Sequence, residues 1–171
     1  MLPRNFTEEQ EMFRDSYLRF LAEEIVPHME AWRAQGIVDR SAFKKAGDRG
    51  FLMIWPDEKY GGLGDNDFRY EQVIMEETAY ARTGDWFSTL HSRLVAPYFT
   101  RFGSEEQCQR YLPGCVSGDT ILAIAMTEPD AGSDLAGMRT NAVEHDDHWV
   151  INGQKTYISN GINADVVILA A

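Results

Sequence analysis

The sequence predicts an α+β fold in which a helical region is followed by a β region. Up to about residue 119, apolar residues recur at the spacing of amphipathic helices. After that point they alternate or form short runs bounded by turn residues, which is typical of strands. We therefore expect two domains, residues 1–119 and residues 120–171.

Composition supports a globular protein and excludes some partners. The chain has 171 residues and a formal net charge of −11, with 44% hydrophobic and 12% aromatic residues, which suffices for a core. Strong acidity disfavours nucleic acid and anionic membrane surfaces, because both require clustered basic residues. Cys108 and Cys115 form no Cys-x-x-Cys pair and the histidines lack metal-ligand spacing, so we predict no metal site.

The termini carry no membrane or targeting signal. Residues 1–5 contain neither an apolar run nor an Arg/Ser-rich presequence. The longest apolar stretch, residues 166–171, is far shorter than the ~20 residues of a membrane span. A cytoplasmic protein is the simplest expectation, although a mature mitochondrial protein without its presequence would look the same.

Helices are predicted from caps and periodicity. Thr7 with Gln10, and Ser104 with Gln107, have the spacing of capping boxes. The first helix should end or kink at Pro27, and the last should end before Pro113. Between them we expect helices over residues 41–48, 68–81 and 86–102. The inner face of the helix over 86–102 is predicted to contain Leu90, Leu94, Val95 and Tyr98.

Strands are predicted after residue 119. A run over 121–126 comes first, and 141–144 with 149–152 reads as a hairpin around a polar turn. Residues 155–159 are predicted as the next strand, followed by the turn dipeptide Asn160-Gly161. Residues 165–169 are predicted as a buried last strand. Because a buried strand needs partners on both sides, we expect the natural polypeptide to continue beyond residue 171.

Two segments of the β region are candidates for chemistry. In the first, residues 123–134, a strand leads into a loop with small residues and two hydroxyls, Thr127 and Ser133. Such a loop can bind a flat heterocycle or a phosphate, but an ordinary turn explains the composition as well. In the second, Tyr157 and Ser159 would share one face of a strand, and simple packing of Tyr157 is the alternative.

Together these segments resemble a known family. Residues 126–134, Met-Thr-Glu-Pro-Asp-Ala-Gly-Ser-Asp, resemble the acyl-CoA dehydrogenase signature. Residues 152–161, Asn-Gly-Gln-Lys-Thr-Tyr-Ile-Ser-Asn-Gly, resemble the family's next motif, in the expected order and separation. Residues 7–10, 20–24, 60–64 and 101–107 are similar to its helical domain. The resemblance covers essentially the whole chain and is nearest to the long-chain and isovaleryl-like branches.

The resemblance implies a fold and a cofactor. In this family an N-terminal helical domain, a barrel- or sandwich-like middle β-domain and a C-terminal helical bundle enclose FAD, and this chain lacks the bundle. The implied FAD-binding residues are Ile124, Met126, Thr127, Ser133, Tyr157, Ile158 and Ser159. Thr127 would bond the flavin pyrimidine, Tyr157 would cover the ring and Ser159 would bond near N5. Ser133 would also contact the CoA part of the substrate. Asp130, where many members have Gly, is expected to face solvent.

The resemblance also implies a reaction, the α,β-dehydrogenation of an acyl-CoA in fatty-acid or branched-chain oxidation. A Glu removes the α-proton while a hydride passes to the flavin. That Glu lies in the family's C-terminal bundle, so no catalytic residue is assigned here and the isolated chain is expected to be inactive. Electron-transfer flavoprotein as electron acceptor and a homo-oligomeric state are likewise implied.

Two alternatives stay open. Related flavin oxidases and hydroxylases share the architecture, and most residues that distinguish them lie outside this chain. A non-catalytic helical assembly module with a vestigial β-extension is the second alternative. The hydroxyls Thr127, Ser133 and Ser159 count against the module, because a scaffold has no need of them.

Overall fold

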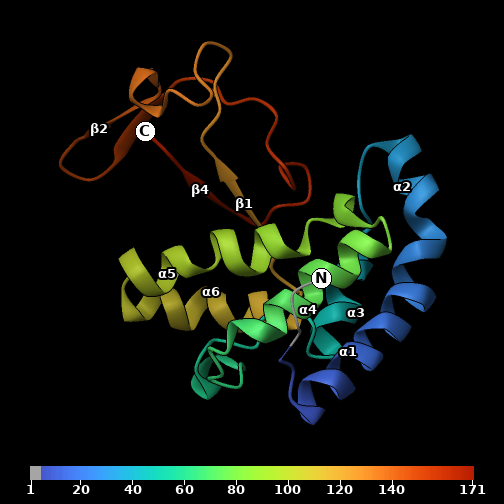
Figure 1. The fold of residues 1–171 in the computed structure, drawn as a ribbon. Coiled ribbons are helices and arrows are strands. Elements are labelled where there is room, and N and C mark those ends of the chain that lie inside the picture. Colours follow the sequence, from blue (N-terminus) through green and yellow to red (C-terminus); the bar gives the residue numbers. More distant parts are fainter. Residues whose placement is uncertain (1–4) are drawn as a thin grey trace.

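The computed structural model describes residues 5–171, so residues 1–4, where no targeting segment was expected, lie outside the described part. Figure 1 shows the strands gathered together on one side of the helices. The α-helices are α1 (Glu8–Phe20), α2 (Met29–Gln35), α3 (Arg40–Asp48), α4 (Phe68–Tyr80), α5 (Pro97–Phe102) and α6 (Glu105–Ser117). The strands are β1 (Leu122–Ala125), β2 (Asn141–Glu144), β3 (Trp149–Asn152) and β4 (Val166–Leu169). The predicted α+β class is confirmed.

Both predicted capping boxes are present. The Thr7 hydroxyl accepts from the Gln10 N–H at 3.2 Å, and the Gln10 side chain accepts from the Thr7 N–H at 3.1 Å. Ser104 and Gln107 repeat the arrangement at the start of α6. Each box satisfies backbone donors that the first helical turn leaves without partners.

Pro27 interrupts the first helix as predicted. After α1 the chain forms a π turn (Leu21–Ile25) and a 3₁₀ turn (Val26–His28) before α2 begins. Proline has no N–H to continue the α-helical hydrogen bonds, so the chain changes its winding there.

Two helix predictions were wrong because tertiary packing outweighs local preference. Helix α6 runs through Pro113 to Ser117, since Leu112 and Cys115 on either side of the proline are fully buried. The region predicted as one helix over 86–102 is a 3₁₀ turn (Gly84–Trp86), a π segment (Leu90–Val95) and α5. In a π segment the backbone hydrogen bonds join residues five apart instead of four, so the residues that share one face follow a different spacing than in an α-helix. Val95 is therefore buried, whereas Leu94 is 50% exposed.

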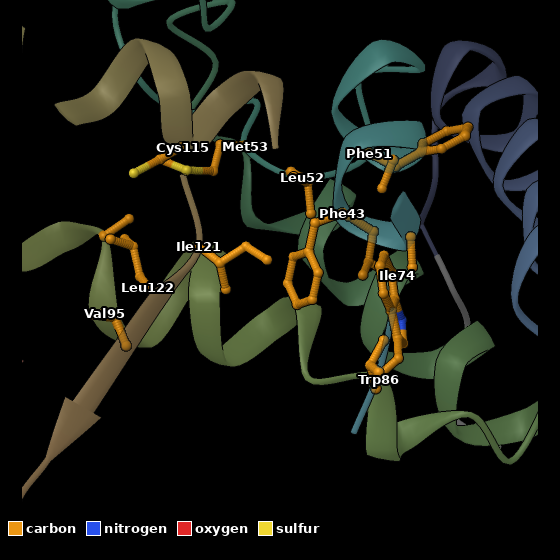
Figure 2. Packing of buried hydrophobic residues seen from close by; sticks show 14 of the residues in the cluster. Phe43, Phe51, Leu52, Met53, Ile74, Trp86, Val95, Cys115, Ile121 and Leu122 are labelled. Atoms are coloured by element: carbon orange, nitrogen blue, oxygen red, sulfur yellow. The ribbon is translucent and has the colours of Figure 1, made fainter. Parts of the chain in front are cut away.

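The core of the helical domain extends into the first strand. Phe43 and Trp86 lie at its centre with ring centroids 5.5 Å apart, and Ile74 packs beside them (Figure 2). Ile121 and Leu122, at the start of the β region, belong to the same cluster of buried residues. Burial at about 25 cal/mol per Å² of apolar surface is what holds β1 against the helices.

The β region departs from prediction in two places. β1 pairs with β4 in parallel and β2 with β3 antiparallel, so the predicted hairpin is confirmed. Residues 155–159 are not a strand, because Tyr157 (φ 56°) and Asn160 (φ 62°) turn the backbone into the left-handed region. The last strand was predicted as buried, but Val167 is 44% and Leu169 38% exposed. Only one side of β4 packs on the core.

Polar contacts fix the β region to α3. Arg40, the first residue of α3, forms an ion pair with Asp165 at 2.8 Å. The same Asp165 oxygen accepts from the Ile121 N–H at 2.7 Å, next to β1. The Asn163 side chain donates to the Val38 carbonyl at 2.6 Å. These contacts hold the segment between Ser159 and β4 against the chain that joins α2 to α3.

Candidate functional site

The first candidate segment is a strand that ends in a tight turn. β1 is buried along its whole length, and Met126 and Thr127 follow it in half-buried positions. The Glu128 N–H donates to the Ala131 carbonyl at 2.8 Å, which reverses the chain. Pro129 and Asp130 occupy the exposed tip of this turn. Asp130 faces solvent as predicted and pairs with Arg139 at 3.3 Å.

The second candidate segment lies beside the first. The Thr156 N–H donates to the Thr127 carbonyl at 2.9 Å. Farther along, the Asn160 side chain donates to the Leu122 carbonyl in β1 at 3.3 Å. The two motifs, which are separated in sequence by the hairpin, are therefore brought together in space.

Several polar groups of these segments have no partner within residues 5–171. The backbone N–H groups of Thr127, Gly132 and Ser133 donate to no oxygen of the described chain. The hydroxyls of Thr127, Ser133 and Ser159 also make no hydrogen bond in that range. Ser133 is exposed, and Thr127 and Ser159 are half-buried. The segments therefore present donors that a ligand rich in carbonyl and phosphate oxygens can use.

The strand predicted around Tyr157 is wrong, whereas the roles of Tyr157 and Ile124 in cofactor binding stay predictions. Tyr157 does not share a strand face with Ser159, because its backbone is left-handed and no strand forms there. Its side chain is 92% exposed. Ile124 is 8% exposed and packs in the core, so its side chain offers little surface to a ligand.

Ile158 and Ser159 open onto a cavity of about 360 Å³. Its other walls come from α2 with the loop that follows it, and from the 3₁₀ turn near Asp85 and Phe87. Met126, Thr127 and Ser133 are not among the lining residues. The cavity thus brings the second segment together with the helical domain, whereas the first segment contacts the second through the backbone.

A smaller cavity of about 240 Å³ lies between α4 and the residues that follow it. Leu90 lines it, together with Met75, Thr78 and Ser88. Tyr70, Val73 and Ile74 are buried, as expected for core residues.

A buried ion pair joins the two segments, and the sequence did not indicate it. Lys155 Nζ lies 2.8 Å from Glu128 Oε1, and the side chains are 9% and 5% exposed. The Lys155 hydrogen bond, with those from Thr140 and Arg139, lowers the pKa of Glu128 to about 2. Glu128 is thus ionised at neutral pH. No spacing rule reveals such a pair, because the partners lie on separate segments.

Metal and membrane features are absent from the described residues. Within residues 5–171 no group of three or more His, Cys, Asp and Glu side chains is arranged to hold a metal ion. No helix in that range is both long and apolar enough to cross a membrane. Cys108 and Cys115 are buried free thiols.

Comparison with protein families identifies the chain. The family model for the acyl-CoA dehydrogenase N-terminal domain matches residues 7–119, and the model for the acyl-CoA dehydrogenase middle domain matches residues 123–171. A helical domain followed by a β region with two adjoining loop segments is thus the beginning of a known architecture. The chain belongs to the acyl-CoA dehydrogenase family.

Individual relatives agree. The chain is 46% identical over 169 residues to the mitochondrial long-chain specific acyl-CoA dehydrogenase of Sus scrofa, a match that covers 98% of this chain and 39% of the relative. A crystal structure of acyl-CoA dehydrogenase from Geobacillus kaustophilus is 48% identical with a TM-score of 0.93, covering 98% of this chain and 44% of that one. The Bacillus anthracis enzyme complexed with FAD is 32% identical with a TM-score of 0.89, covering 99% of this chain and 30% of that one. The chain spans about two fifths of the length of the curated relative.

Proposed function

We propose that this chain forms the helical and middle-domain part of a FAD-dependent enzyme that dehydrogenates an acyl-CoA thioester at its α and β carbons. The observation that carries the proposal is the hydrogen bond from the Thr156 N–H to the Thr127 carbonyl. It aligns two loop segments in which the hydroxyls of Thr127, Ser133 and Ser159 have no partner within residues 5–171. The Bacillus anthracis relative, whose structure contains FAD, supports the cofactor.

The residues present fit this cofactor. Free N–H groups at Thr127, Gly132 and Ser133 suit carbonyl and phosphate oxygens, and small side chains at Ala131 and Gly132 allow close approach. The exposed ring of Tyr157 is available to pack on a flat ligand. FAD, when bound, supplies the hydride acceptor. Preorganised donors at the loop would stabilise negative charge that develops on it.

The proposal places other parts of the function outside these residues. We assign no catalytic residue, because the ionised Glu128 is held by three donors inside the protein and cannot act as a base toward a substrate. We propose that the base belongs to a part of the enzyme beyond these 171 residues. An electron-transfer flavoprotein as electron acceptor, a homo-oligomeric state and a cytoplasmic location complete the proposal.

The isolated chain is expected to bind FAD weakly and not to dehydrogenate acyl-CoA. Binding can be measured by quenching of flavin fluorescence, and turnover with acyl-CoA and an artificial electron acceptor. The double variant Thr127→Val/Ser159→Ala is expected to lower the affinity for FAD by about 30-fold, because two hydrogen bonds of ~1 kcal/mol each are removed.

The matched control is Ser16→Ala/Thr100→Val, which removes two hydroxyls from the helical domain and should leave the FAD affinity unchanged. Equal affinities for the two double variants would contradict the placement of the flavin. Turnover by the chain alone would show that the base lies within these residues.

A further inference from the structure

The Lys155 ammonium group donates hydrogen bonds to three acceptors from separate parts of the β region. Its nitrogen lies 2.9 Å from the Met126 carbonyl, 2.8 Å from Glu128 Oε1 and 3.5 Å from the sulfur of Met138. An ammonium group has three N–H donors, so this environment uses all of them. The Lys155 side chain is 9% exposed.

The Glu128 carboxylate also accepts three hydrogen bonds from the protein. Besides the one from Lys155, it accepts from the Arg139 N–H at 2.7 Å and the Thr140 N–H at 2.9 Å. Those two residues lead directly into β2. The pair therefore ties together the end of β1, the turn after it, the entry to the hairpin and the segment that leaves the hairpin.

The contacts surround Thr127. Its neighbours Met126 and Glu128 are both held by Lys155, and its own carbonyl accepts from Thr156, the residue after Lys155. Three consecutive residues of the first segment are thus bonded to two consecutive residues of the second. Thr127 cannot shift relative to Lys155 and Thr156, which lead to Ser159, without breaking at least one of these bonds.

A contribution to folding stability does not by itself explain why this ion pair is buried. Removing two charges from water is costly, and replacement of a buried ion pair by apolar residues of similar volume is often neutral or stabilising. What the pair supplies here is a fixed geometry between two loops that have no strand pairing with each other.

We propose that Glu128 and Lys155 are positioning residues that hold the two FAD-binding segments in register, an inference that rests on the proposed function. Both side chains make their hydrogen bonds to protein groups. They act through the backbone of Met126–Glu128 and of Thr156, and so set where the Thr127 and Ser159 donors point.

The test uses the 171-residue chain with the double variant Glu128→Gln/Lys155→Met, which removes both charges and preserves side-chain volume. The control, Arg14→Met/Glu77→Gln, removes a partly buried ion pair (2.5 Å) in the helical domain, whose side chains are 28% and 5% exposed. The site variant is expected to lower the affinity for FAD by about tenfold or more. At metal sites, loss of a residue that orients a metal ligand has an effect of about 10- to 100-fold, and the expected value is the lower end of that range. It should also accelerate hydrogen exchange at the Thr156 amide. The control should change neither, whatever its thermal midpoint.

Two results would overturn the proposal. One is a site variant that keeps wild-type FAD affinity and Thr156 protection. The other is an equal loss in both variants that follows the thermal midpoint, which would make the pair merely structural. If the wild-type chain binds no FAD, the proposed function fails. In that case hydrogen exchange at the Thr156 amide still tests the positioning role of the pair. Faster exchange only in the site variant would support that role, and unchanged exchange would refute it.

Discussion

The contribution of His91 to the free energy of unfolding is expected to fall by about 3 kcal/mol as the pH is lowered from 6.5 to 4. His91 is fully buried, and burial lowers its pKa from 6.5 to about 4, although the hydrogen bond to Cys115 opposes the shift. Between these two values the unfolded chain binds a proton that the folded chain does not. Stability therefore rises with pH across this window and is lost as the pH falls.

The hydrogen bonds explain why the folded state requires neutral His91. Its Nδ1 lies 3.2 Å from the Leu122 N–H, so this nitrogen must accept, and Nε2 donates to the Cys115 carbonyl at 3.0 Å. A second proton on Nδ1 would face the Leu122 N–H. His91 thereby joins the π segment, the end of α6 and the start of β1, and its protonation should loosen the junction on which the candidate site is built.

Urea unfolding of wild type and His91→Asn at pH 4, 5, 6.5 and 7.5 measures this effect. Asn can still accept from Leu122 but cannot gain a proton, so the variant should be less stable at pH 7.5 yet lose less stability on acidification. His28→Asn, at an exposed position, is the control and should follow the wild-type profile. Parallel profiles for wild type and His91→Asn would refute the role of His91.

Features that depend on neighbours in sequence were predictable. The capping boxes at Thr7 and Ser104 and the hairpin over residues 141–152 need only local residue types, and the structure confirms them. Pro27 likewise acts through its own missing N–H. The helix through Pro113 was not predictable from local pattern, because burial of Leu112 and Cys115 decides it.

The two motifs of the candidate site could be predicted from the sequence, but their three-dimensional arrangement could not. The resemblance named Thr127 and Ser159, whereas alternating residue types wrongly suggested a strand through Tyr157. The Lys155–Glu128 pair spans 27 positions and was missed, because a buried Lys has the same sequence signature as an exposed one. Long-range polar contacts of this kind become visible only when the fold is known.

Gly118→Ala is expected to destabilise the protein by about 2–5 kcal/mol, the sum of left-handed strain and overpacking. Gly118 follows α6 with φ 78°, and a Cβ there would lie 2.1 Å from the Phe43 carbonyl oxygen in α3. Phe43 is fully buried against Trp86, so α3 cannot retreat without disturbing the core.

The variant Gly50→Ala separates the left-handed strain from the overpacking. Gly50 has φ 74°, close to that of Gly118, but a Cβ there would meet nothing within 4 Å. This control should therefore cost only the left-handed strain of about 1–2 kcal/mol. Urea unfolding at pH 7.5 of both variants gives the difference, which measures the close approach of α6 to α3. Equal losses would mean that α3 moves freely. They would contradict a rigid contact between α3 and α6 next to β1 and the first candidate segment.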